Sequence, residues 1–91
     1  MEKVKVLFRK NDGGVYAFFP EATANYGMVM TYAHIGQHSE ASLEFYLNSK
    51  KATKEEYANL LSELENIYDD CTLVVKHRMN YNDLRDSWYR R

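Results

Sequence analysis

Alternation of apolar and polar residues marks the first part of the chain. It runs through residues 4–9, and residues 15–19 form a second run rich in β-branched and aromatic side chains. A period of two is typical of a half-buried strand, so both segments are predicted to be strands. Asp12-Gly13 between them suits the positive φ angles of a tight hairpin turn, which predicts antiparallel neighbours. Pro20 ends the second strand because proline has no N–H to donate to a sheet.

Three further segments have the pattern of strands, although one of them is ambiguous. Residues 26–34 are predicted to form a third strand, and residues 71–77 a short later one in which Leu73 and Val75 face the core. Apolar and polar residues also alternate over residues 43–47. That alternation fits a fourth strand, but so short a segment is also little more than one helical turn. Strand and helix both stay open for this segment.

The clearest element is a helix that begins after Thr53. Thr53 and Glu56 match the capping box, in which the hydroxyl and the carboxylate each accept a hydrogen bond from the other residue's backbone N–H. The apolar side chains that follow recur at the three- and four-residue spacing of one helix face. They are Tyr57, Leu60, Leu61, Leu64, Ile67 and Tyr68. A second helix, capped by Asn80 or Asn82, is predicted near the end of the chain. Its apolar stripe consists of Tyr81, Leu84 and Trp88.

The order of these elements, β-β-β-(β)-α-β-α, predicts an α+β fold. We expect a small single-domain sandwich over residues 1–91, in which two helices cover one face of a mostly antiparallel sheet. Four glycines, one proline and no repetitive stretch give no sign of a linker or an internal repeat. One domain therefore accounts for the whole pattern.

Composition narrows the function classes further. The 91 residues carry a formal net charge of −1, and the longest apolar run, residues 15–19, is far shorter than the roughly 18 residues of a membrane span. The first residues lack the apolar segment of a secretory signal, so we expect a cytoplasmic protein that does not bind membranes. A single cysteine, Cys71, excludes a disulfide within the chain and zinc patterns that need several cysteines.

Several segments together resemble a group of short bacterial proteins of the phage and mobile-element accessory type. They are Phe8-Arg9-Lys10, residues 17–21, Tyr-Ala-His-Ile-Gly-Gln-His-Ser at residues 32–39, residues 52–57 and residues 63–65. Lys51 and Lys54 depart from the pattern, because the relatives have proline at those positions. The resemblance implies a bacterial cytosolic setting, and it supplies no activity because none is assigned to the group.

Catalytic chemistry finds little support in the sequence. His34, His38 and Glu40 have the side chains of a metal site, but along a continuous strand the two histidines would lie about 13 Å apart, so only a tight loop would bring them together. Cys71 and His77 are separated by about 20 Å within their predicted strand, so they form no nucleophilic pair there, although a pairing of Cys71 with His34 or His38 across the fold stays open. Because free cysteine is among the most buried residue types, a buried structural cysteine is favoured. We therefore expect no enzyme, no metal and no cofactor. A metal-dependent enzyme built on the two histidines is the third hypothesis.

A polar loop after the third strand is the leading candidate site. Loops held by a rigid strand commonly carry recognition groups, and six donor or acceptor side chains fall within nine residues here. They are Tyr32, His34, Gln37, His38, Ser39 and Glu40. The leading hypothesis is a small non-enzymatic binding or regulatory module with a protein partner. The alternative is that these side chains only satisfy the backbone of the loop.

The runner-up is a nucleic-acid-binding accessory protein that uses the basic end of the chain. Cationic residues alternate there with aromatic ones, as on a surface that stacks bases. The cationic residues are Lys76, Arg78, Arg85, Arg90 and Arg91. A pI near 6.3 and an acidic helix beside them argue instead for a solvated helix face. The eight tyrosines suggest interface area, and four of them are expected to be exposed. These are Tyr16, Tyr26, Tyr46 and Tyr89. The oligomeric state is left open.

Overall fold

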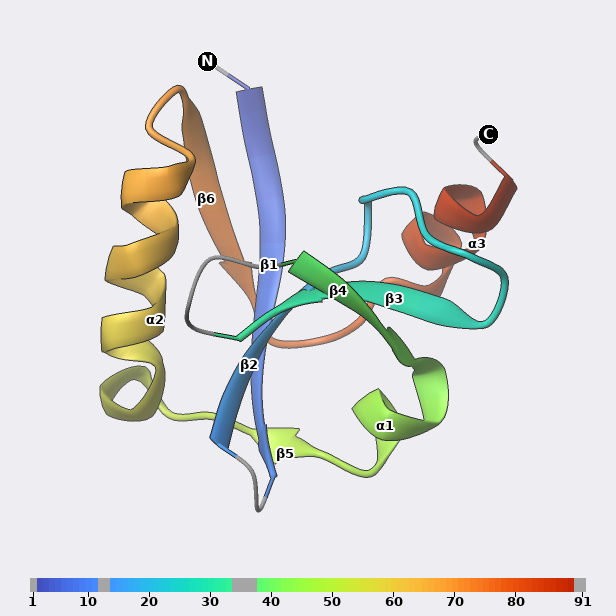
Figure 1. Ribbon diagram of the computed structural model, residues 1–91, viewed down its shortest axis with the longest axis horizontal. Helices are drawn as coiled ribbons and strands as arrows, with labels where there is room; N and C mark the ends of the chain where they lie inside the picture. The colour runs from blue at the N-terminus through green and yellow to red at the C-terminus, as the bar shows by residue number, and fades with distance from the viewer. Residues whose placement is uncertain (1, 12–13, 34–37, 90–91) are drawn as a thin grey trace.

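The structure, a computed structural model, describes residues 2–11, 14–33 and 38–89, and a six-stranded sheet forms the centre of this part of the chain (Figure 1). The strands are β1 (Glu2–Asn11), β2 (Gly14–Phe19), β3 (Met28–Tyr32), β4 (His38–Ser42), β5 (Lys50–Lys51) and β6 (Cys71–Lys76). The helices are α1 (Leu43–Leu47), α2 (Lys54–Ile67) and α3 (Tyr81–Tyr89). Within the described ranges, no helix has the length and apolar character needed to cross a membrane. The α+β class is confirmed.

β1 is the central strand, because it pairs with β2, β5 and β6. The order is β4-β3-β2-β1-β5, and β6 lies beside β1 on the same side as β5. Residues 7–11 of β1 pair antiparallel with β2, and residues 2–7 pair with β6 in the one parallel ladder among the described strands. Asn11 lies opposite Gly14, so the predicted antiparallel hairpin is confirmed, although its turn at residues 12–13 lies outside the described residues.

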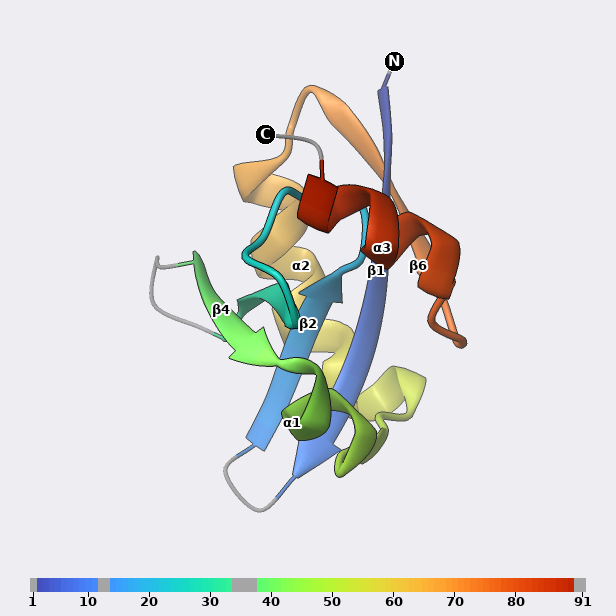
Figure 2. The same ribbon diagram turned by 90° about the vertical axis from the view of Figure 1, so that its right-hand side faces the viewer.

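The helices divide between the two faces of the sheet, contrary to the prediction that both cover one face. α2 packs on one face, whereas α1 and α3 pack on the other (Figures 1 and 2). Val6 and Phe8 point toward α2, and Leu7 between them points toward α1 and α3. All three side chains are buried. Because β1 is apolar on both sides at its centre, each face needs its own cover.

Specific contacts hold α2 and α3 on their faces. The rings of Phe8 and Tyr57 stack nearly parallel, with centroids 4.3 Å apart and an interplanar angle of 11°. On the other face, Leu84 is buried, and the indole N–H of Trp88 donates to the backbone oxygen of Met28 at 2.7 Å. The second contact ties α3 to the first residue of β3.

The predicted helix caps are present. Thr53 Oγ1 accepts from Glu56 N at 3.2 Å, and the Glu56 carboxylate accepts from Thr53 N at 2.8 Å, so the capping box is confirmed. The Asn80 side-chain oxygen accepts from the backbone N–H groups of Asn82 and Asp83, which settles which asparagine caps α3.

The ambiguous segment at residues 43–47 is helix α1, and the strand lies just before it, as β4. Ser42 decides the local structure because its Oγ accepts from Phe45 N at 3.1 Å and so caps the turn. Tyr46 in this helix is buried against the sheet, contrary to the prediction that it is exposed. The alternation of residues 43–47 therefore fits a strand, whereas the capping residue before them, Ser42, favours the helix.

Candidate functional site

The residues of the predicted polar loop are divided between the two faces of the sheet. Tyr32 and His38 are opposite each other in the β3–β4 ladder and face α2, whereas Ser39 faces the side of α1 and α3. Tyr32 is fully buried and His38 is exposed. His34 and Gln37 lie outside the described residues. The four described members of the set thus form no single continuous surface.

Two members of that set have structural partners. Glu40 accepts from the backbone N of Asn25 at 2.6 Å and from its side-chain Nδ2 at 2.9 Å, which ties β4 to the turn before β3. The Ser39 hydroxyl lies 3.2 Å from the hydroxyl of Thr31, its neighbour in the sheet, which also donates to the Ser39 backbone oxygen at 2.9 Å. These hydrogen bonds account for Glu40 and Ser39 without a ligand.

His38 belongs instead to an aromatic cluster at the end of α2. Its Nε2 lies 2.7 Å from the hydroxyl of Tyr68, and its ring contacts those of Phe19 and Tyr32. The Tyr32 hydroxyl donates to the carboxylate of Glu63 on α2. Burial raises the pKa of Tyr68 above its ordinary value, so its phenol stays a hydrogen-bond donor well above neutral pH. These contacts hold Tyr68, the C-cap residue of α2, against the sheet.

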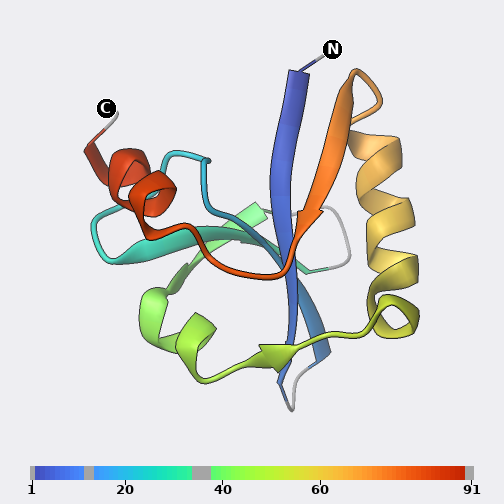
Figure 3. The ribbon, with the colours of Figure 1, turned by 180° about the vertical axis from the view of Figure 1, so that it is seen from behind.

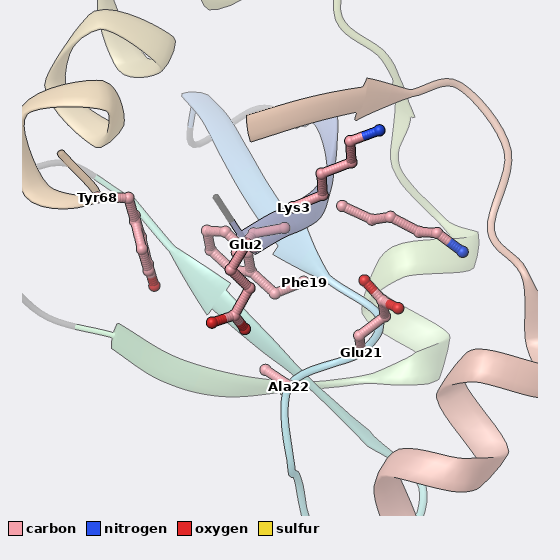
Figure 4. A pocket seen from close by; sticks show the side chains of 8 residues that line it. Glu2, Lys3, Phe19, Glu21, Ala22 and Tyr68 are labelled. Atoms are coloured by element: carbon pink, nitrogen blue, oxygen red, sulfur yellow. The ribbon is translucent and has the colours of Figure 1, made fainter. Parts of the chain in front are cut away.

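A groove of about 320 Å³ begins where this cluster ends, and we call it the β1 groove. Figure 4 shows Phe19 at its floor, Tyr68 and Glu2 on one side, and Glu21 and Ala22 on the other. Lys3, Val4 and Lys5 complete its lining.

The backbone along the groove is an open strand edge. β2 pairs with β1 only from residue 7 onward, because the chain turns away after Phe19, with the N–H of Ala22 donating to Phe19 O. Among the described residues, no strand therefore pairs with residues 2–5 of β1 on this side. Phe8 O accepts from Ala52 N on the opposite side, and backbone groups alternate along a strand, so those of Lys3 and Lys5 point toward the groove.

The rim of the β1 groove carries both positively and negatively charged side chains. Lys5 Nζ donates to Asp83 Oδ2 at 2.8 Å, and this hydrogen bond raises the pKa of Lys5, an effect that nearby Glu21 increases. Glu2 and Lys3 are exposed at the start of β1. The groove thus combines an apolar floor, a charged rim and an unpaired backbone edge.

The cationic residues of the runner-up hypothesis do not all gather on α3. Lys76 and Arg78 line one small hollow together with Lys5 and Asp83, whereas Arg85 is exposed on α3. Arg90 and Arg91 lie outside the described residues. Of the tyrosines predicted to be exposed, Tyr26 and Tyr89 are 73% and 69% exposed, and Tyr16 is half-buried.

Two observations within the described ranges concern the metal and nucleophile hypotheses. No three His, Cys, Asp or Glu side chains there are grouped so that they could hold a metal ion. Burial raises the pKa of Cys71, and the hydrogen bond from its thiol to Asp70 adds to the effect. A raised pKa disfavours the thiolate, which is the nucleophilic form of cysteine.

No protein-family model, curated protein or solved structure matches this chain. The resemblance to short bacterial accessory proteins stays a prediction. The β1 groove was not found from the sequence, because its lining comes from the start of β1, the turn after β2 and the end of α2. Pro20 was the one local signal, since a strand that stops early leaves its neighbour unpaired.

Proposed function

We propose that this protein is a non-enzymatic binding module that binds an extended segment of a partner protein along the open edge of β1. The observation that carries the proposal is the unpaired stretch at residues 2–5, which lies directly beside the β1 groove. An added strand would complete its hydrogen bonds with the backbone groups of Lys3 and Lys5. Strand addition of this kind is a common way for a sheet to recognise a peptide.

The groove also limits what the added segment contains. Residues 2–5 extend over about 13 Å, so the edge accommodates about four residues of an extended chain. Every second side chain of that segment would point into the groove, where Phe19, Ala22 and Tyr68 present apolar surface. We therefore expect one apolar side chain at the centre of the segment.

Hydrogen exchange measured by NMR tests the open edge directly. The amides of Lys3 and Lys5 should exchange much faster than those of Val4 and Val6, because alternate residues direct their N–H groups toward β6. A random nonapeptide display library selected on the immobilised protein supplies the probe. The selected peptide should protect Lys3 and Lys5 and leave the exchange of Val4 and Val6 unchanged.

A pair of variants at one position separates backbone recognition from charge. Lys3→Pro removes the N–H that faces the groove and leaves the pairing with β6 in place, whereas Lys3→Ala removes the same charge and keeps the N–H. We expect peptide affinity to fall at least tenfold in Lys3→Pro and to change little in Lys3→Ala. Equal affinities, or a library that yields no binder, would refute strand addition. Protection of Lys3 and Lys5 that depends on protein concentration alone would identify a second copy as the occupant instead.

A further inference from the structure

A further hollow, of about 390 Å³, lies on the face of the sheet that α1 and α3 cover, and we call it the basic hollow. It is bounded by the end of α1, by β5 and by the segment that leads from β6 to α3, which Figure 3 shows crossing β1 above α1. Its lining consists of Arg9, Tyr46, Leu47, Lys51, His77, Arg78, Met79 and Tyr81. Three of these residues are Lys or Arg, and none is Asp or Glu. The whole chain, in contrast, has more acidic than basic residues.

The central cation of the basic hollow is held in place before any ligand arrives. Arg9 Nε donates to Ser49 Oγ at 3.0 Å, and its Nη2 donates to Ser49 O at 2.6 Å. The guanidinium also lies over the ring of Tyr46, 4.7 Å from the centroid. Two of its five N–H donors are used in this way, and the other three have no partner among the described residues. A fixed guanidinium loses little conformational entropy on binding an anion.

The second cation, Lys51, lies where the positive charge of Arg9 repels it unless an anion is present. Lys51 lies directly opposite Arg9 in the β1–β5 ladder, and like charges at such positions destabilise a sheet. The next pair along, Lys10 and Lys50, is also like-charged, but there Glu56 forms a salt bridge with Lys10 at 2.6 Å. Lys51 forms no ion pair among the described residues. An anion between Lys51 and Arg9 would relieve their repulsion as Glu56 relieves the other pair.

We propose that the basic hollow binds the phosphate groups of a single-stranded nucleic acid. Arg9, Lys51 and Arg78 supply positive charge, and Tyr81, which is 48% exposed at the rim, offers a ring for stacking a base. Arg78 also lines the adjacent hollow with Lys76, where the carboxylate of Asp83 is paired with Lys5, so cationic groups extend past one phosphate group. The site therefore suits successive phosphates of a strand. It is separate from the β1 groove, and it combines Arg78 of the cationic set predicted from the sequence with Arg9 and Lys51, which that set did not include.

Fluorescence anisotropy with labelled dT12 tests the proposal on the full chain. Each phosphate contact on a single strand contributes about −0.7 to the slope of log K against log salt concentration, so three cations predict a slope of about −2. Lys51→Gln and Arg78→Gln should each weaken binding roughly fivefold at low salt and reduce the steepness of the slope by about 0.7. Tyr81→Ser should weaken it at least fivefold, while Tyr81→Phe should keep the stacking and the affinity.

Arg85→Gln provides the matched control, because it removes one charge from exposed α3 outside the basic hollow. We expect its affinity to stay within twofold of the original. Equal losses in Arg85→Gln and Arg78→Gln would overturn the assignment to the hollow, as would the absence of binding by the original chain at low salt. Competition by dTMP as effective per phosphate as that by dT12 would overturn the assignment to a strand. Thermal unfolding of each variant establishes that the loss does not come from misfolding.

Discussion

The stack between Phe8 and Tyr57 is the main aromatic contact between β1 and α2, and its contribution to stability can be measured. Both side chains are more than nine-tenths buried. Replacing either by leucine should lower the free energy of unfolding by about 1 to 2 kcal/mol, because part of the apolar volume is kept. Nearly parallel rings with centroids 4.3 Å apart should add about 1 kcal/mol beyond the buried area. The double variant should therefore lose about 1 kcal/mol less than the two single losses predict.

Urea unfolding of the original chain, the two single variants and the double variant gives this coupling from four midpoints. With Tyr57→Phe in place of Tyr57→Leu the cycle should give a coupling near zero, because the ring that stacks on Phe8 stays and Phe8→Leu then costs the same in both backgrounds. Phe8→Leu combined with Leu84→Ala is the control, because Leu84 packs on the opposite face and the two losses should add. A Phe8–Tyr57 coupling below about 0.3 kcal/mol would contradict the argument and leave buried area as the whole contribution.

Three further predictions concern α2 and the strand that follows it. Thr53→Ala should lower the free energy of unfolding by about 1 kcal/mol in urea titrations, because it removes the cap of α2, and an unchanged midpoint would contradict this role. The hydrogen bond from Lys10 lowers the pKa of Glu56 to about 2 from 4.5, so its contribution to stability is complete above pH 4.5 and is lost as the pH falls toward 2. Unfolding measured across that range should depend less on pH in Glu56→Gln. Cys71 should react slowly with iodoacetamide at pH 8, and Asp70→Asn should accelerate it, since Asp70 helps to raise the pKa of the thiol.

Local rules predicted three features that depend on neighbouring residues. The capping box at Thr53, the cap at Asn80 and the hairpin between β1 and β2 each depend on residues a few positions apart. Residues 43–47 show the limit of such rules, because their alternation fits a strand while one hydroxyl, that of Ser42, caps a helical turn. The side chains that α1 buries then favour the helix.

Features that depend on residues distant in sequence could not be predicted from local patterns, for a physical reason. The pattern of β1 shows that Val6, Leu7 and Phe8 are apolar, but it does not show which helix covers which face. The two candidate sites depend on the same kind of information. The β1 groove follows from how early β2 leaves β1, and the basic hollow from the register that places Lys51 opposite Arg9.

The parallel ladder between β1 and β6 has a consequence for the order of folding. Glu2 is paired with Cys71, so this ladder cannot close during synthesis until β6 has left the ribosome. The hairpin of β1 and β2 can form long before that, leaving one side of β1 exposed to solvent and to other chains in the meantime. Contacts so distant in sequence slow the final step. We expect β1 to be the segment of the nascent chain that most needs protection from aggregation.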